Sequence, residues 1–287
     1  MITIKDIEGA THEMRDGEPL RHFIHADCMD GMRQFPDDYF GLAIVDPPYG
    51  VGTVTYMPRK RQKGFGGHID RYDVVVATLD MHQRAKMKVD VVHTQSGKKT
   101  IKTFGDENTA PCPEYFEELF RVSKNQIIFG GNYFLLPPSR CYVVWDKGIS
   151  EDFSMAMCEM AWCSMQGNAK LIKGIYADRN RTQSKEARLH PVQKPIELYS
   201  KLLAWYAKPG DRILDTHVGS ASSLIACHRA GLEYVGFEID ADYYNAARER
   251  LDAELAQTSM FELAENGRGV IDGRYRAGSG RRRLCVD

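Results

Sequence analysis

The chain has 287 residues, 43% of them hydrophobic and 27% charged, which predicts one large globular domain or one domain with an insertion. No stretch approaches the roughly 18 apolar residues of a membrane-spanning helix, and the first residues do not resemble a signal peptide, so we expect a cytoplasmic protein without membrane contact. Seven cysteines without a CxxC spacing indicate reduced thiols and predict no metal site. The formal net charge of −1 excludes binding of nucleic acid by bulk charge and leaves local basic patches for that purpose.

The first predicted elements lead to a short apolar strand with an unusual end. A strand over Arg21–Ala26 and a short helix precede the apolar run Gly41–Val45. The residues that follow this run are Asp46, Pro47, Pro48 and Tyr49. Because the two prolines fix φ and remove two N–H donors, the chain cannot pair onward as sheet at this point.

This tetrapeptide offers hydrogen-bond acceptors and a flat ring to a ligand. The proline carbonyls can accept hydrogen bonds, the Asp46 carboxylate lies beside them, and Tyr49 presents a stacking face, a role that Phe is expected to fill as well. The set suits a planar, amine-bearing ring such as a nucleobase. The alternative is an ordinary proline-rich turn after a strand, since short motifs also match by accident.

A long segment, residues 50–110, follows the tetrapeptide. It contains the basic run Arg59–Lys63, a glycine-rich stretch, and one apolar piece, Tyr72–Leu79, that reads either as a strand or as a buried helix turn. Long irregular segments inside a compact domain tend to be functional or disordered. A charge run by itself is more often only a solvated surface, so both interpretations of Arg59–Lys63 are open.

Helix and strand patterns alternate over the next hundred residues. Apolar spacing predicts a helix over Pro113–Ser123, with its proline in the first turn. Apolar runs predict strands over residues 126–131 and 141–145, and weak alternation predicts an edge strand over Met157–Ser164. Lys194–Ala207 is predicted as an amphipathic helix.

A strand–helix–strand unit occupies Asp211–Asp240. It comprises a strand over Arg212–Leu214, a tight turn over Asp215–Ser220, a helix to about Arg229 and a strand over Tyr234–Ile239. Such a unit can hold an adenosine-containing cofactor, with Glu238 accepting from the ribose hydroxyls and Gly219 allowing close approach of the backbone. The lack of GxGxxG disfavours a dinucleotide. Many α/β proteins contain such a unit with no ligand, so this alternative is open.

Strands separated by helices predict an α/β fold with a mostly parallel, twisted sheet and helices on both faces. Ligands bind beyond the carboxyl ends of such strands, so Asp46 and Asp215 are expected to face one crevice. We expect a single catalytic domain over residues 1–262, which closes with a helix through Tyr243–Ala256, and a flexible basic tail over residues 263–287.

The motifs in this order resemble those of one enzyme family. The DPPY tetrapeptide, HPVQKP at His190–Pro195 and the turn Asp215–Gly219 together resemble the permuted (β-class) amino-methyltransferases of DNA, and the resemblance extends from about Phe23 to Leu251. It implies a Rossmann-like methyltransferase fold with a cyclically permuted motif order. It further implies S-adenosylmethionine as methyl donor and double-stranded DNA, with the target base flipped out, as partner. A homodimer is left open.

The resemblance implies roles for individual residues. The expected catalytic residues are Asp46, Pro47, Pro48 and Tyr49. The expected cofactor-binding residues are Asp27, Lys194, Asp215, His217, Gly219, Ser220 and Glu238. Two of these have a second interpretation: Asp27 either contacts the adenine of the cofactor or caps its own turn, and Lys194 either meets the carboxylate of the cofactor or only starts its helix.

One departure from the family pattern concerns the cofactor turn. Where relatives read DPFxGSG, this chain has Thr216 and His217 in place of Pro-Phe and Ala221 in place of the second glycine. The His217 ring can still stack on the cofactor. Ala221 is expected to reduce cofactor affinity if its position requires a positive φ.

The resemblance favours transfer of a methyl group to the exocyclic N6 amine of adenine in DNA. Hydrogen bonds from that amine to Asp46 and to the Pro47 carbonyl would direct its lone pair at the methyl group. The alternatives are N4 of cytosine in DNA, adenine in RNA, and a catalytically inactive nucleic-acid-binding subunit with a degenerate methyltransferase fold. The predicted DNA contacts lie in residues 50–110, through Arg59, Lys60, Arg61 and Lys63, and in residues 167–189.

Overall fold

The computed structural model describes residues 1–50, 54–58, 72–76, 110–151, 156–175 and 193–272. The strands in these residues are β1 (Ile2–Lys5), β2 (Thr11–Met14), β3 (Arg21–His25), β4 (Leu42–Val45), β5 (Val54–Pro58), β6 (Tyr72–Val76), β7 (Gln126–Phe129), β8 (Tyr142–Asp146), β9 (Cys158–Cys163), β10 (Lys170–Ile172), β11 (Arg212–Asp215) and β12 (Glu233–Glu238). The helices are α1 (Cys28–Met32), α2 (Pro113–Val122), α3 (Ile196–Tyr206), α4 (Ser222–Arg229) and α5 (Ala241–Asp272). None of these helices is long and apolar enough to cross a membrane.

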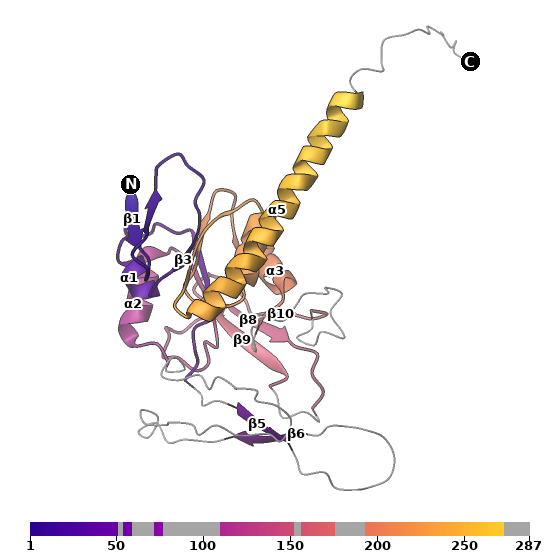
Figure 1. Cartoon of the computed structure of the whole chain (residues 1–287). Helices are drawn as coiled ribbons and strands as arrows, with labels where there is room; N and C mark the ends of the chain where they lie inside the picture. Colours follow the sequence, from indigo (N-terminus) through magenta and orange to yellow (C-terminus); the bar gives the residue numbers. More distant parts are fainter. Residues whose placement is uncertain (51–53, 59–71, 77–109, 152–155, 176–192, 273–287) are drawn as a thin grey trace, which may run out of the picture.

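An eight-stranded sheet forms the centre of the fold (Figure 1), in the order β10-β8-β9-β7-β4-β11-β12-β3. All of its strands run parallel except β9, which is antiparallel to both β7 and β8. The predicted α/β fold with a mostly parallel sheet is therefore confirmed. β1 pairs with β2, and β5 with β6, in separate antiparallel hairpins. Of the predicted piece Tyr72–Leu79, the described residues Tyr72–Val76 form the strand β6, and the other three lie outside the described residues.

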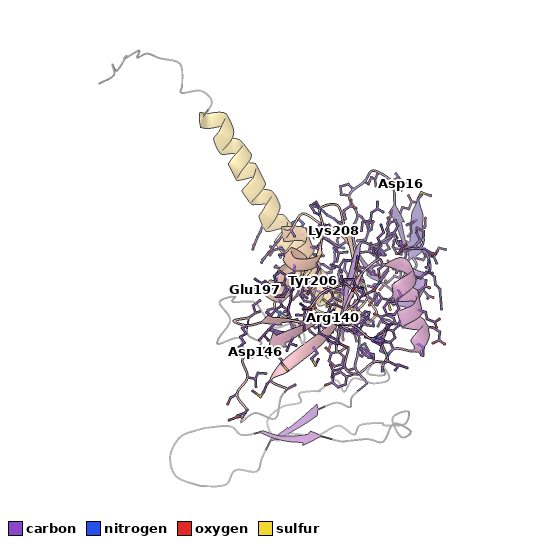
Figure 2. All side chains as sticks on the ribbon, turned by 180° about the vertical axis from the view of Figure 1, so that it is seen from behind. Asp16, Arg140, Asp146, Glu197, Tyr206 and Lys208 are labelled. Carbon is purple, nitrogen blue, oxygen red and sulfur yellow. The ribbon has the colours of Figure 1, made fainter. Side chains whose placement is uncertain are left out.

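Two hydrophobic clusters cover the two faces of the sheet, as predicted. α3, α4 and the first part of α5 pack on one face, and α1, α2 and the β1–β2 hairpin pack on the other. Along β4, Leu42 and Ile44 belong to the first cluster, and Ala43 and Val45 to the second. Because β4 is buried on both sides, it reads as a continuous apolar run rather than an alternating one. The charged side chains Asp16 and Lys208 are both exposed, and Asp16 lies at the edge of the molecule in Figure 2.

The order of the strands reverses between β4 and β11. From β4 the chain continues through α2 to β7 on one side, and from β11 it continues through α4 to β12 on the other. The two strands pair directly, with Ile213 opposite Leu42. In open α/β sheets the crevice at such a switch point is where ligands bind. Asp46 and Asp215 stand at the carboxyl ends of these two neighbouring strands.

Two predictions about secondary structure are wrong. The segment Met157–Ser164 was expected at an edge, but β9 lies inside the sheet. Its first residue, Cys158, is exposed because this end extends past β7, whereas Ala161, Trp162 and Cys163 are buried between two neighbours. The tail was expected to begin at residue 263, yet α5 continues to Asp272 and extends away from the sheet (Figure 1). A helix satisfies its own backbone hydrogen bonds, so it can continue past the part that packs.

Candidate active site

The Asp46 carboxylate is held from two directions at the end of β4. The Tyr49 hydroxyl donates a hydrogen bond of 2.7 Å to Oδ1, and Lys194 Nζ donates to Oδ2. Burial, and then the charge of Asp46, raise the pKa of Tyr49 far above its usual value, so the hydroxyl stays protonated and remains a donor. The position and orientation of Asp46 are thus set before any ligand binds.

The Tyr49 ring packs among other aromatic rings at this end of the sheet. It stacks on Tyr133, with ring centroids 5.1 Å apart and planes 18° apart, and meets the edge of Phe134 at 6.2 Å. Gly130, with φ of +67°, lies under the ring, and a Cβ at this position would come within 2.3 Å of it. Tyr49 therefore already stacks on one aromatic partner, and the ring of any ligand would have to share or replace that contact.

Lys194 lies on the acceptor side of the crevice. Its side chain is 4% exposed and forms ion pairs with Asp46 and, at 3.2 Å, with Glu159 on β9. Burial alone would lower the pKa of Lys194, but the two carboxylates raise it above its usual value. Pro195 is the N-cap of α3, so Lys194 precedes the helix rather than starting it. The structure thus gives Lys194 a partner, Asp46, that neither sequence interpretation named.

The turn after β11 is built around the buried carboxylate of Asp215. This carboxylate accepts a hydrogen bond of 3.0 Å from the His217 backbone N–H and another from the Ser223 hydroxyl on α4. Burial raises the pKa of Asp215 to about 7. Asp215 therefore organises the turn from inside.

The His217 side chain is electrically neutral at neutral pH. Burial lowers its pKa to about 4. Its Nδ1 lies 2.9 Å from the Thr216 hydroxyl, which in turn lies 2.6 Å from the Tyr115 hydroxyl on α2. The ring also meets Tyr115 edge to face, with centroids 5.5 Å apart. These contacts tie the cofactor turn to α2 and fix the orientation of the imidazole.

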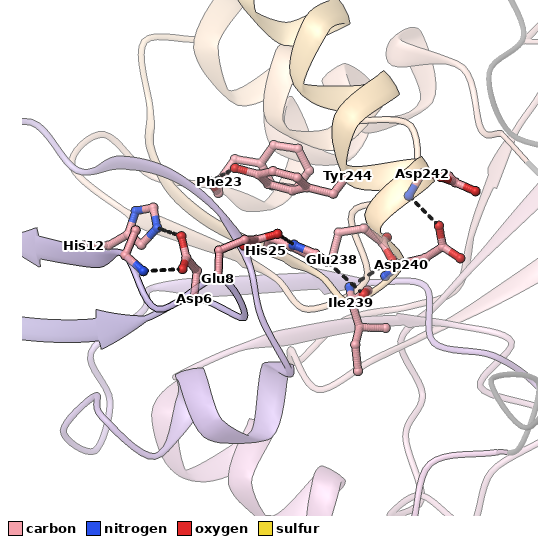
Figure 3. A network of polar contacts seen from close by, with 11 residues as sticks. Asp6, Glu8, His12, Phe23, His25, Glu238, Ile239, Asp240, Asp242 and Tyr244 are labelled. Carbon is pink, nitrogen blue, oxygen red and sulfur yellow. Dashed lines mark hydrogen bonds and ion pairs between the residues drawn. The ribbon is translucent and has the colours of Figure 1, made fainter.

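Glu238, at the end of β12, is anchored by three backbone N–H groups. Its carboxylate accepts hydrogen bonds from Gly219 at 2.9 Å and from Ile239 and Asp240 at 3.0 Å each. Figure 3 shows this loop together with His25, whose Nε2 lies 3.1 Å from the Ile239 carbonyl and whose ring stacks on Tyr244. The loop that carries Glu238 is thus pinned to β3 and α5.

The glycine and the alanine of this turn both have positive φ. Gly219 has φ of +56° and open space where a Cβ would lie, which leaves room for a ligand close to its backbone. Ala221 has φ of +62°, so the position does adopt the conformation that favours glycine. Its methyl group is buried in the core with α4. The cost of this alanine is therefore backbone strain, about 1–2 kcal/mol for a left-handed residue.

Asp27 and Ser220 have local structural partners. Asp27 Oδ1 accepts a hydrogen bond of 2.7 Å from the Met29 N–H and caps α1, one of the two roles expected for it. Ser220 is buried; its hydroxyl lies 3.2 Å from that of Ser222, and its carbonyl accepts from Arg250 on α5. Their expected contacts to a cofactor stay predictions.

The expected site residues thus gather at neighbouring strand ends. Asp46 and Tyr49 are joined to Lys194, and Asp215 and Glu238 enclose the turn beside them. The expected DNA contacts Arg59, Lys60, Arg61 and Lys63 lie outside the described residues. Of the segment 167–189, the described part contains the edge strand β10.

Sequence reasoning missed Glu159, Lys147 and Tyr133. Glu159 is a carboxylate inside an otherwise apolar strand, a signal of a buried functional charge, but the alternation of that strand indicated an exposed edge. Lys147 follows β8 directly and binds Glu159 at 2.8 Å. Tyr133 follows the glycine pair after β7, a position at the same end of the sheet as Asp46.

Comparison with known proteins gives a consistent result. The sequence profile of a DNA methylase family (N6_N4_Mtase) matches residues 40–249. The type II methyltransferase M.HinfI of Haemophilus influenzae is 21% identical over 259 residues, which are 81% of this chain and 68% of that protein. The putative methylase YubD of Escherichia coli K12 is 24% identical over 262 residues, 86% of this chain and 96% of that protein.

Solved structures are similar at lower sequence identity. The complex of M1.HpyAVI with SAM is 15% identical, with a TM-score of 0.42, over 80% of this chain and 98% of that one. The cytosine-N4-specific PvuII DNA methyltransferase is 12% identical, with a TM-score of 0.46, over 81% of this chain and 88% of that one.

Proposed function

We propose, given that this chain belongs to the DNA methylase family, that it transfers a methyl group from S-adenosylmethionine to the exocyclic N6 amine of adenine in DNA. The observation that carries this proposal is the position of the Asp46 carboxylate, oriented by Tyr49 and Lys194 and placed beside the β11–α4–β12 unit. A carboxylate fixed at a topological switch point, next to a second ligand-binding turn, suits a reaction between two bound molecules. The DPPY sequence favours adenine over cytosine.

S-adenosylmethionine is the methyl donor of this family, and the residues after β11 and β12 fit it. Glu238 is fixed by three N–H groups and can accept from the ribose hydroxyls, since each carboxylate oxygen has two lone pairs. Gly219 leaves open space beside its backbone, and the neutral His217 ring offers a stacking surface without a positive charge. When bound, the cofactor supplies a methyl group already activated on a sulfonium.

The chain's own residues must make a weak nucleophile reactive. The lone pair of an aromatic amine is delocalised into its ring, and hydrogen bonds from the amine to Asp46 and to the Pro47 carbonyl favour a pyramidal nitrogen. Pro48 keeps the chain from pairing onward, which leaves the Pro47 carbonyl available to the ligand. Fixed acceptors of this kind stabilise charge that develops in the transition state without reorganising at the moment of reaction.

We assign contacts with DNA to two segments that flank the acceptor loop and Lys194 in sequence. Arg59, Lys60, Arg61 and Lys63 follow the acceptor loop in sequence, and residues 167–189 precede Lys194. We assign phosphate contacts to the first segment and some base contacts to the second. The number of phosphate contacts can be measured from the slope of the logarithm of the binding constant against the logarithm of the salt concentration, which changes by about one unit for each contact.

The decisive experiment identifies the modified base. The protein is incubated with methyl-labelled cofactor and either duplex DNA or RNA, in separate reactions, and the nucleic acid is digested to nucleosides. Label in N6-methyl-2′-deoxyadenosine is expected. Label in N4-methyl-2′-deoxycytidine would move the reaction to cytosine, and label transferred only to RNA would move it to the other nucleic acid. Asp46→Ala should abolish transfer and change cofactor affinity by less than about tenfold, which is about 1.4 kcal/mol.

A further inference from the structure

A chain of alternating charges extends inward from Asp46. Lys194 Nζ binds Asp46 Oδ2 on one side and lies 3.2 Å from Glu159 Oε2 on the other. Glu159 Oε1 lies 2.8 Å from Lys147 Nζ. The ring of Phe129 lies 4.6 Å from Lys194 Nζ. Two carboxylates therefore share one almost fully buried ammonium group.

The antiparallel direction of β9 brings Glu159 to this place. The parallel strands end at the crevice, and β9 begins there, with Glu159 opposite Trp145 and Cys158 opposite Asp146. Lys147, which follows β8, consequently meets Glu159 from the neighbouring strand. If β9 were parallel, its first residues would lie at the opposite edge of the sheet.

Charge pairing keeps the buried groups ionised. Burial by itself would raise the pKa of Glu159, but Lys194 and Lys147 hold it below its usual value. A buried charge is tolerated when it is paired, and removal of one partner leaves the other uncompensated. The four side chains together carry no net charge, and within this chain the Lys194 ammonium is shared between Asp46 and Glu159 rather than paired with Asp46 alone.

We propose that Glu159 is a positioning residue for methyl transfer, because it shares Lys194 with Asp46 and so preserves the capacity of Asp46 to accept from the target amine. This inference rests on the proposed function. In the step concerned, the amine nitrogen bonds to the methyl carbon as the carbon–sulfur bond breaks and leaves its electron pair on sulfur. The nitrogen then gives a proton to Asp46. An ammonium paired with Asp46 alone would neutralise the carboxylate that has to receive these hydrogens.

The test compares charge-removing and charge-retaining variants at Glu159. Glu159→Gln should lower the single-turnover rate of methyl transfer at least tenfold, while the cofactor dissociation constant and the KM for DNA stay within about twofold of the wild type. Glu159→Asp retains the charge and should recover a large part of the rate. A lower rate of methyl transfer with an unchanged dissociation constant and KM indicates that the lost interaction is made in the transition state.

A matched control is available on the far side of the same domain. Glu254 is covered to a similar degree, with 18% of its side chain exposed against 21% for Glu159, and it pairs with Arg229. Glu254→Gln removes a carboxylate that is covered to a similar degree, although its partner Arg229 is half exposed, and it should leave the rate unchanged. Thermal unfolding of both variants shows any general loss of stability.

Three results would overturn the inference. A Glu159→Gln rate within twofold of the wild type is one, and a change in cofactor affinity alone is the second. The third is a rate loss of the same size in Glu159→Gln and Glu159→Asp that parallels the loss of thermal stability in the two variants. A wild-type protein that methylates no DNA would instead refute the proposed function, and the inference with it.

Discussion

The Tyr49 hydroxyl donates a 2.7 Å hydrogen bond to Oδ1 of Asp46, while the Tyr49 ring stacks on Tyr133. The acceptor motif is thus internally linked, since its aromatic residue orients its own carboxylate. The sequence suggested a stacking face alone, so that Phe would retain most of the activity. The structure gives the hydroxyl a role as well.

We therefore predict that Tyr49→Phe lowers kcat for methyl transfer about ten- to a hundredfold. A hydrogen bond to a charged group contributes about 1.5–3 kcal/mol, and its loss lets Asp46 turn away from the amine. Tyr133→Phe keeps the stacked ring and serves as the control, with a rate near that of the wild type. Equal rates for Tyr49→Phe and the wild type would show that only the ring matters.

The close approach of Gly130 to Tyr49 leads to a second prediction. Gly130→Ala places a methyl group against the Tyr49 ring at a position with φ of +67°, so both steric overlap and backbone strain result. We expect loss of most methyl transfer and a decrease of about 2–4 kcal/mol in the free energy of unfolding.

Gly174→Ala separates the two causes. Gly174 has φ of +81° but no neighbouring atoms within 4 Å of the place where a Cβ would lie, so alanine there adds strain without overlap. Chemical denaturation and a methyl-transfer assay of both variants provide the measurement. If Gly130→Ala behaved like Gly174→Ala in both, the packing of Tyr49 on Gly130 would be unimportant.

Titration of Asp215 and titration of His217 should change the free energy of unfolding in opposite directions as the pH rises. The pKa of Asp215 is raised to about 7 in the folded state, so the folded protein binds more protons than the unfolded chain, and this contribution to stability falls as the pH rises from about 4 to 7. The pKa of His217 is lowered to about 4, so its contribution is present above about 6.5 and is lost as the pH falls toward 4.

Single variants should reveal the two opposing slopes. Asp215→Asn can still accept from the His217 N–H and pair with Ser223, and its stability should rise with pH between 4 and 6.5 because only the histidine contribution remains. His217→Asn should show the reverse slope between 4 and 7. Denaturation at a series of pH values measures both. Parallel pH profiles for the two variants would contradict the assignment.

Glu238 provides a prediction about the cofactor. Glu238→Gln removes the charge but keeps the shape, and we expect the dissociation constant of S-adenosylmethionine to rise at least tenfold, with little change in kcat at saturation. Asp240→Asn is the matched control: Asp240 Oδ1 accepts from the N–H groups of Asp242 and Tyr243 at the start of α5, and asparagine preserves that acceptor. Calorimetry measures both variants. Unchanged affinity for Glu238→Gln would leave Glu238 only its role in holding the loop.

The sequence alone determined the features that depend on neighbouring residues. The apolar run before Asp46 predicted a buried strand, and the proline pair predicted where it stops. The order of strands and helices around Asp215 predicted a parallel sheet and hence a shared crevice for Asp46 and Asp215. These inferences succeed because periodicity, proline and glycine act over a few residues along the chain.

The tertiary structure alone decided which charges meet. Lys194 binds Asp46 across 148 positions of sequence, and Glu159 reaches the same ammonium only because β9 runs antiparallel inside the sheet. A sequence pattern indicates how far an element is buried, but it does not indicate which strand pairs with it. The weak alternation of residues in β9 therefore resembled the pattern of an edge strand. The partner of a buried charge depends on sheet order and strand direction, which form only when distant segments pack together.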